Sequence, residues 1–169
     1  DGSGIPGSET GRTVKVGVLQ PVTGDLGNLG GPIRDAAILP GSQLDGEVDF
    51  DLDIRDEDTE SAPEAGISAA NALANAGYPA VTGAASSAVT QNVAQSVFIP
   101  QGIVGCSPAS TSPAITNLDD DDLIFRTAPS DALQGEVMAQ VAFEDRDLQS
   151  AAVFHLNNEY GELLSESFA

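Results

Sequence analysis

Two short turns, both rich in hydroxyl side chains, carry the residues of this sequence that are best suited to chemistry. Residues 83–87 read G-A-A-S-S and residues 105–113 read G-C-S-P-A-S-T-S-P, and each turn separates a short apolar run from a helix start. In an open parallel sheet, ligands bind just outside the carboxyl ends of the strands. The free N–H groups of a helix N-terminus favour an anion at that place. The two turns therefore predict a site for a small carboxylate.

These hydroxyl residues also have a purely structural explanation. Serine and threonine are good helix caps in any protein, so a single Ser-rich turn indicates little. A ligand site is favoured because the turns recur at two successive strand ends of one predicted sheet. Both explanations stay open on the pattern alone. The hydroxyl residues that we take as candidates for ligand binding are Ser86, Ser87, Ser110, Thr111 and Ser112.

The second turn also resembles the nucleophile elbow of a serine hydrolase. Ser107 would be the nucleophile, and Asp131 and His155 follow it in the order that such enzymes use. The elbow needs the N–H of the residue after the nucleophile as an oxyanion donor, and Pro108 has no N–H. We therefore expect no hydrolase, and we expect His155, the only histidine, to be structural or at the rim of a cleft.

A run of acidic residues imitates the ligand spacing of a calcium loop. Asp49, Asp51, Asp53 and Glu60 stand at suitable positions, but the sixth position, which requires glycine for a sharp turn, is Ile54. Strict alternation of acidic and apolar residues is the pattern of a strand with one buried face. We therefore predict a strand at 49–54 and no calcium site.

Three glycines after the first apolar run suggest a dinucleotide-binding loop. Gly24, Gly27 and Gly30 have the spacing G-x-x-G-x-x-G, whereas the dinucleotide loop requires G-x-G-x-x-G. A bent loop at the edge of a cleft is the better interpretation.

Composition excludes several classes of partner. The 169 residues carry 26 Asp and Glu against 6 Lys and Arg, a formal net charge of −20. Such a chain repels nucleic acid and anionic membranes, which both need clustered basic residues. A hydrophobic fraction of 41% argues against disorder. The charge indicates a folded protein with an acidic shell, of the kind that halophiles tolerate because salt screens its repulsion.

Alternating strands and helices predict the fold. This order is typical of a parallel, doubly wound α/β sheet. We predict strands at 14–19, 49–54, 79–83, 102–106, 123–125 and 150–156. We predict helices near Pro32, after Ser61, at 87–98 and 131–145, and from Glu159 onward.

Three predictions concern details of these elements. Pro40-Gly41 should kink or end the first helix early. Val89, Val93 and Val97 should face the core from one helix. Leu133, Val137 and Val141, with Met138 and Ala142 alongside, should do so from another.

The ends of the chain differ from its middle. Residues 1–12 are rich in glycine and serine and predict a flexible tether. No run approaches the 18 apolar residues of a membrane span, and the single Cys106 predicts a small buried thiol. Residues 165–169 read as mid-helix, so we expect the chain to be a fragment of a longer protein.

Five segments, in order, resemble one family. From residue 14 to the chain end, the sequence is similar to the substrate-binding proteins of ABC importers for branched-chain amino acids, the Leu/Ile/Val-binding type I periplasmic-binding family. The matching segments are V-K-V-G-V-L-Q-P-V-T-G-D-L-G-N-L-G, G-A-A-S-S-A-V-T, S-P-A-S-T-S-P, F-R-T-A-P-S-D-A-L-Q-G and N-N-E-Y-G.

The resemblance implies roles for three residues of the two turns. Ser87 matches the serine that hydrogen-bonds the α-carboxylate of the ligand through its hydroxyl and N–H. Thr111 matches the threonine that binds the ammonium and carboxylate region. Ala109 matches the position whose carbonyl accepts from the ammonium.

The resemblance also places residues around the rest of the pocket. Ala85 and Leu29 match positions at the side-chain end, although the family has an aromatic residue at the position of Leu29. Tyr160 matches a tyrosine of the second lobe that faces the cleft. Ser86 occupies one position of a disulfide found in some bacterial members, and with Ser110 it completes the expected lining.

The family folds as two α/β lobes joined by hinge strands that close over an amino acid. The resemblance therefore implies an N-terminal ligand-binding lobe at 13–125 and a hinge crossing with the start of a truncated second lobe at 126–169. It implies a non-catalytic extracellular protein, lipid-anchored at the cell surface, without a cofactor. Such a protein delivers a small amino acid or related carboxylate to an ABC permease; the haloarchaeal members fit the acidic charge. The alternative is an extracellular ligand-sensing receptor domain of the same fold.

Overall fold

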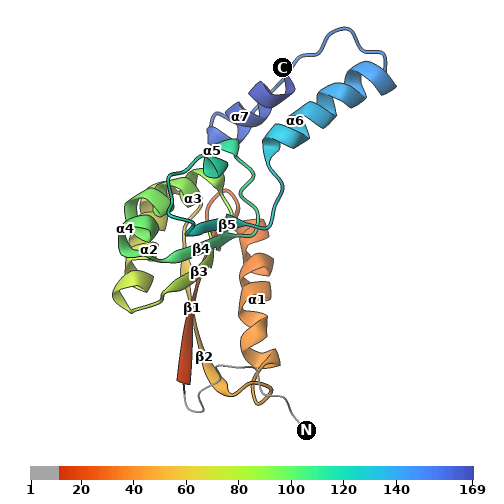
Figure 1. The fold of residues 1–169 in the computed structure, drawn as a ribbon. Helices are drawn as coiled ribbons and strands as arrows, with labels where there is room; N and C mark the ends of the chain where they lie inside the picture. Colours follow the sequence, from red (N-terminus) through yellow and green to blue (C-terminus); the bar gives the residue numbers. More distant parts are fainter. Residues whose placement is uncertain (1–11) are drawn as a thin grey trace.

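A parallel sheet organises the computed structural model, which describes residues 12–169 (Figure 1). Its five strands stand in the order β2-β1-β3-β4-β5, and every neighbouring pair is parallel. The sequence-based prediction of a parallel α/β fold is confirmed. The strands are β1 (Arg12–Gln20), β2 (Phe50–Asp58), β3 (Ala80–Gly83), β4 (Val104–Ser107) and β5 (Ile124–Arg126).

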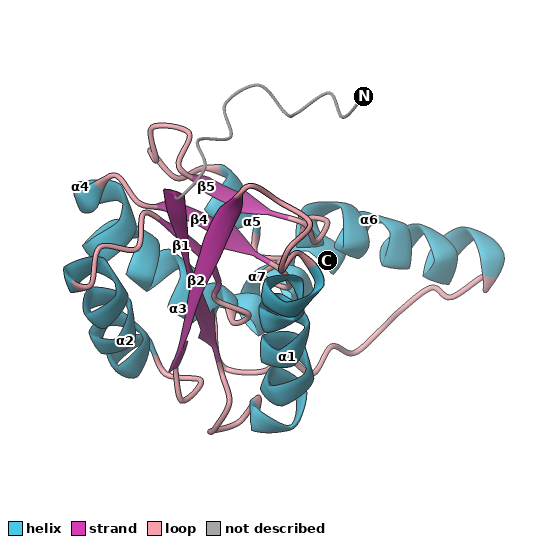
Figure 2. Ribbon diagram, turned by 90° about the horizontal axis from the view of Figure 1, so that it is seen from below, coloured by secondary structure: helices cyan, strands magenta, loops and turns pink. Residues whose placement is uncertain are grey.

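Helices cover both faces of this sheet. Figures 1 and 2 show α1 against one face and α2, α3 and α4 against the other. The α-helices are α1 (Gly27–Gln43), α2 (Pro63–Asn75), α3 (Ser87–Val93), α4 (Ile99–Gln101), α5 (Pro113–Thr116), α6 (Asp131–Gln140) and α7 (Glu159–Phe168). Two π-helical turns, η1 (Ala94–Phe98) and η2 (Val141–Asp145), extend α3 and α6.

The core lies between the sheet and the layer of α2 and α3. Val89, Val93 and Val97 are fully buried there, as their four-residue spacing predicts. Leu73 of α2 and Leu19 of β1 complete the centre of the cluster. This tightly filled layer fixes the strand ends that carry the two hydroxyl turns.

The first helix is longer than predicted. It runs from Gly27 to Gln43 through both Pro32 and Pro40, so the expectation that Pro40-Gly41 ends it early is wrong. A proline removes one helical hydrogen bond, but the carbonyl of Pro40 still accepts from the N–H of Leu44 at 2.9 Å. Helix α1 also packs on β1 and β2, and this packing outweighs the lost bond.

Strand β2 is also longer than predicted, and one of its carboxylates is not solvent-facing. Asp53 accepts a hydrogen bond from Tyr78 Oη at 3.0 Å and is only partly exposed. Leu52 and Ile54 face α1 on the other side. Helices therefore lie over both faces of this edge strand, since α1 and α2 both contact it. Burial and the Asp53 hydrogen bond raise the pKa of Tyr78.

The C-terminal part departs most from prediction. Residues 150–156 form no strand, since the structure places no strand beside them in the part of the chain it describes. Helix α6 with η2 occupies the predicted 131–145, yet Leu133 and Val137 are 58% and 47% exposed. His155 is exposed rather than within a strand. Residues 12–169 contain no helix with the length and apolarity needed to cross a membrane.

Two smaller predictions concern other parts of the chain. The predicted tether falls on residues 1–11, which lie outside the described range, and on Arg12, which is the first residue of β1. Cys106 is half-buried in β4 and is a free thiol.

Candidate functional site

The carboxyl ends of β1, β3 and β4 lie at one edge of the sheet and bring three connecting loops together. Strand β3 ends at Gly83, whose φ of +142° is rarely adopted by other residues. A Cβ at this position would lie 2.1 Å from the carbonyl oxygen of Leu19 in β1. Only glycine therefore allows the first hydroxyl turn to leave the sheet so close to β1.

A buried network of hydroxyl groups joins the two turns. Ser107 Oγ donates to the carbonyl of Ala84 at 2.5 Å, and Thr90 Oγ1 donates to the same carbonyl at 2.9 Å. Ser110 Oγ lies 2.8 Å from Thr90 Oγ1 and 3.1 Å from the carbonyl of Ala85. All three hydroxyl residues are buried. The network fixes the second turn against the first.

This network gives Ser107 and Ser110 structural positions. Ser107 is fully buried, and its oxygen also accepts from the N–H of Ser110 at 3.0 Å. A hydroxyl with these partners is not exposed for nucleophilic attack. Ser110 is also fully buried, and its hydroxyl holds the second turn against the first.

Ser87 opens α3 at the end of the first turn. It is 4% exposed, and its Oγ accepts from the N–H of Ser112 in the second turn at 3.3 Å. The Ser87 hydroxyl donates to no partner among residues 12–169, so its proton is available to a ligand anion. Ser86 precedes it as the N-terminal boundary residue of α3, and its side chain makes no capping hydrogen bond.

Thr111 is tied to a buried carboxylate at the start of α6. Its Oγ1 donates to Asp131 Oδ2 at 2.7 Å, and the N–H of Asp131 donates to the carbonyl of Thr111 at 2.8 Å. Asp131 is fully buried. In the sequence, Asp131 stood out only as a possible member of a serine-hydrolase triad. Its hydrogen bond with Thr111 could not be predicted, because no local sequence pattern connects the two residues.

The remaining predicted residues are less enclosed. Ala85 is buried in the first turn and Ala109 is exposed on the second. Leu29 on α1 is 62% exposed, and Tyr160 on α7 is 38% exposed. Helix α7 contacts α3, which brings the segment of Tyr160 toward the helix that Ser87 begins.

Glu159, the residue before Tyr160, takes part in this contact between α7 and α3. The side-chain amide of Gln91 on α3 faces the carboxylate of Glu159 on α7. Burial first, and the nearby charge of Glu162 second, raise the pKa of Glu159. The start of α7 is thus partly desolvated against α3.

A carboxylate clamp holds the loop between β1 and α1. Asp58, at the end of β2, accepts from the N–H groups of Val22, Thr23 and Glu60 and from Thr23 Oγ1 at 2.6 Å. Partial burial acts to raise the pKa of Asp58, but these hydrogen bonds outweigh it and lower the pKa below its ordinary value. The clamp fixes the loop that leads to Leu29.

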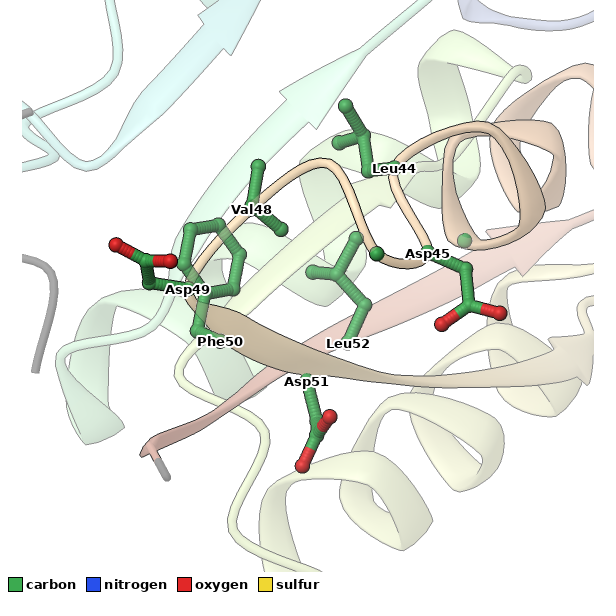
Figure 3. Close-up of a pocket in the computed structure, with 9 residues that line it drawn as sticks. Leu44, Asp45, Val48, Asp49, Phe50, Asp51 and Leu52 are labelled. Carbon is green, nitrogen blue, oxygen red and sulfur yellow. The ribbon is translucent and has the colours of Figure 1, made fainter. Parts of the chain in front are cut away.

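A separate cavity of about 450 Å³ lies at the opposite edge of the sheet (Figure 3). It is formed between the end of α1 and the start of β2. Figure 3 shows Asp49 beside the apolar Val48 and Phe50, Asp45 next to Leu44, and Asp51 on the side of β2 away from Leu52. Acidic walls repel a carboxylate ligand, so the candidate site is the edge that carries the hydroxyl turns. Residues 12–169 contain no cluster of His, Cys, Asp and Glu that could hold a metal ion.

The structure defines a class of fold: an open parallel α/β unit with two hydroxyl-rich turns at neighbouring strand ends. The family model described as periplasmic binding protein matches residues 13–169. This chain belongs to the periplasmic binding protein family.

Known relatives and structures are similar over most of this chain. The leucine-, isoleucine-, valine-, threonine-, and alanine-binding protein of Pseudomonas aeruginosa is 29% identical, over 89% of this chain and 40% of that protein. An ABC transporter substrate-binding protein from Desulfitobacterium hafniense in complex with Leu is 25% identical, with a TM-score of 0.74, over 93% of this chain and 46% of that one. The branched-chain amino acid substrate-binding protein LivJ from Streptococcus pneumoniae, in complex with isoleucine, shares the fold with a TM-score of 0.81 at 21% identity, over 93% of this chain and 46% of that one. The chain thus spans less than half of each.

Proposed function

We propose that this chain carries part of the ligand site of an extracellular solute-binding protein that captures a branched-chain or other small amino acid, or a related carboxylate, for an ABC importer. The single observation that carries the proposal is the pair of hydroxyl turns, joined by the buried network of Ser107, Ser110 and Thr90. Relatives named for binding leucine, isoleucine and valine support this ligand class.

The proposed site divides the two α-groups of the ligand between the two turns. The hydroxyl and N–H of Ser87 bind the α-carboxylate, and Thr111 with the carbonyl of Ala109 binds the ammonium. The other members of the proposed site are Ala85, Ser86, Ser110, Leu29 and Tyr160.

Capture uses hinge closure. The second lobe contacts the ligand only when the cleft is closed, and these contacts then add to the contacts made by the two hydroxyl turns. Tyr160 is the residue of the second lobe that we propose for such a contact. The ligand therefore favours the closed state by its differential affinity, and the permease recognises that state. The boundary between the lobes stays a prediction, with the hinge crossing after residue 125.

The large negative charge of the chain suggests the environment in which the protein works. We propose that the protein works at the outer surface of a halophile, held by a lipid anchor, because salt there screens the repulsion within a chain of net charge −20.

The substitution Ser87→Ala tests the site. In the natural full-length protein it removes a hydrogen bond to a charged carboxylate, which contributes about 1.5–3 kcal/mol, so amino-acid affinity should fall about 10- to 100-fold. A calorimetric titration in molar KCl measures this, after a thermal-shift screen of the amino acids. Ser68→Ala, on the exposed side of α2, is the matched control. Unchanged affinity in the Ser87 variant would place the site elsewhere.

A further inference from the structure

Arg126 is the last residue of β5, and its guanidinium binds both ends of the short helix α5. Its Nη1 donates to the carbonyl of Ser112, which caps α5, at 2.7 Å. Its Nη2 donates to the hydroxyl of Thr116, the last residue of α5, at 2.5 Å. The guanidinium is a planar fork with its donors in a rigid arrangement. Arg126 therefore fixes the position of Ser112 relative to the sheet.

The backbone next to Arg126 is bound to the same hydroxyl turn. The N–H of Thr127 donates to the carbonyl of Ser107 at 3.0 Å, and Ser107 is fully buried. The end of β5 thus holds the second turn at Ser107 through the backbone and at Ser112 through the Arg126 side chain.

The guanidinium of Arg126 forms no ion pair with a carboxylate of the described residues. The two ion pairs among residues 12–169 are Arg34–Asp35 and Arg55–Glu57. Arg126 instead uses its donors on a carbonyl and a hydroxyl, in a chain with 26 Asp and Glu against 6 Lys and Arg. A positive charge without a paired carboxylate favours an anion nearby.

Ser112 connects this guanidinium to the hydroxyl of Ser87. The N–H of Ser112 donates to Ser87 Oγ at 3.3 Å, and both residues are buried. A hydroxyl has one proton to donate and two lone pairs that accept. Because the N–H of Ser112 occupies a lone pair of Ser87 Oγ, the Ser87 proton points away from that N–H. The position of Ser112 therefore decides where Ser87 can donate.

We propose that Arg126 is a positioning residue for capture of the ligand carboxylate. It acts through Ser112, which orients the donor of Ser87, rather than by contact with the ligand. The inference rests on the proposed function and adds the group that holds the Ser87 hydroxyl ready for an anion.

The test is a double-mutant cycle between Arg126 and Ser87 in the natural full-length protein, measured by calorimetry. The ligands are leucine and leucinamide, in which a neutral amide replaces the carboxylate. Charge-assisted hydrogen bonds are roughly twice as strong as neutral ones, so wild type should prefer leucine. Arg126→Gln should weaken leucine about 3- to 10-fold and leucinamide less. In the Ser87→Ala background it should have little further effect, because the group that it positions is gone.

Two further variants complete the cycle. Arg146→Gln removes the same charge from an exposed position and should change neither affinity. Arg126→Lys keeps the charge without the fork and covers the case in which Arg126→Gln does not fold. It should weaken leucine about 2- to 5-fold, again only where Ser87 is present.

The outcomes separate the inference from the proposed function. A wild-type protein that binds neither compound overturns both. An effect of the Arg126 substitutions that is equal with and without Ser87, or equal for leucine and leucinamide, overturns the inference alone. Leucine binding that depends on Ser87 leaves the proposed function standing in that case.

Discussion

Helices α2 and α6 both carry large apolar side chains, but the environments of these side chains are opposite. Leu73 of α2 is fully buried, whereas Leu133 of α6 is 58% exposed. Helix α2 lies against β1, β2 and α3, but α6 packs chiefly on α7. Gly135 allows that contact, because a Cβ there would lie 2.4 Å from Ser167 Cβ. Figure 1 shows the pair projecting beyond the sheet.

The difference shows that periodicity specifies a helix, while a partner surface decides burial. Residues 12–126 supply a sheet, and the apolar sides of α2 and α3 are buried against it. Residues 127–169 supply two helices and no strand, so Val137 and Phe154 remain exposed at 47% and 98%. The bond between Thr111 and Asp131 joins the two regions at the candidate site.

The largest expected effect on stability comes from comparing a leucine-to-alanine substitution in α2 with the same substitution in α6. Leu73→Ala leaves a cavity in the filled core and should lower the free energy of unfolding by about 2–5 kcal/mol. Leu133→Ala removes an exposed side chain and should change it by less than about 0.5 kcal/mol. Denaturant unfolding of the two variants, followed by circular dichroism, measures the contrast. Equal losses would mean that α6 is as well covered in solution as α2.

Salt should act on the charged surface of the whole chain. Raising KCl from about 0.1 M, where the Debye length is about 10 Å, to molar concentration shortens the range of repulsion. The midpoint of thermal unfolding should therefore rise by several degrees, and sodium chloride should act alike because the effect is screening. A midpoint that is equal at both concentrations would contradict the halophilic setting proposed above.

The smallest effect concerns the clamp of Asp58 in the sheet region. The pKa of Asp58 is lower in the folded protein than in the unfolded chain. The Asp58 carboxylate therefore contributes its full stabilisation of the fold at pH values above the unfolded-state pKa of about 3.9. It is lost as the pH falls through the folded-state pKa. Asp58→Asn should reduce stability by about 1 kcal/mol at neutral pH. The difference from wild type should shrink below about pH 4.

Unfolding curves of both proteins at a series of pH values test this prediction. Asp56→Asn, an exposed residue two positions away on the same strand, is the control. A difference between wild type and Asp58→Asn that grows toward low pH would exclude the clamp.

Local patterns in the sequence predicted much of the fold. Alternation at Phe50, Leu52 and Ile54 indicated β2, and the spacing of Val89, Val93 and Val97 indicated the buried side of α3 and η1. The hydroxyl turns were located for the same reason, since their residue types and their position after apolar runs are local properties. Ser112 caps α5 by accepting from the N–H of Ala114 at 3.2 Å, a role that serine commonly takes at the start of a helix.

Other features depended on contacts between distant residues. The predicted strand at 150–156 did not form, because β-pairing needs a neighbouring strand and not only an apolar run. The helix through Pro40 formed because packing on β1 and β2 compensates for one lost hydrogen bond. Local propensity cannot report either effect.

The sequence by itself determined the parallel α/β class, the acidic surface and the two turns that could bind a carboxylate. Only the tertiary structure showed that Thr90, Ser107 and Ser110 hold these turns together, and that Asp131 accepts a hydrogen bond from Thr111. The reason is that a hydrogen bond between residues 20 positions apart depends on where the sheet places two loops. Residue type sets what each group can donate or accept, and the fold decides which groups meet.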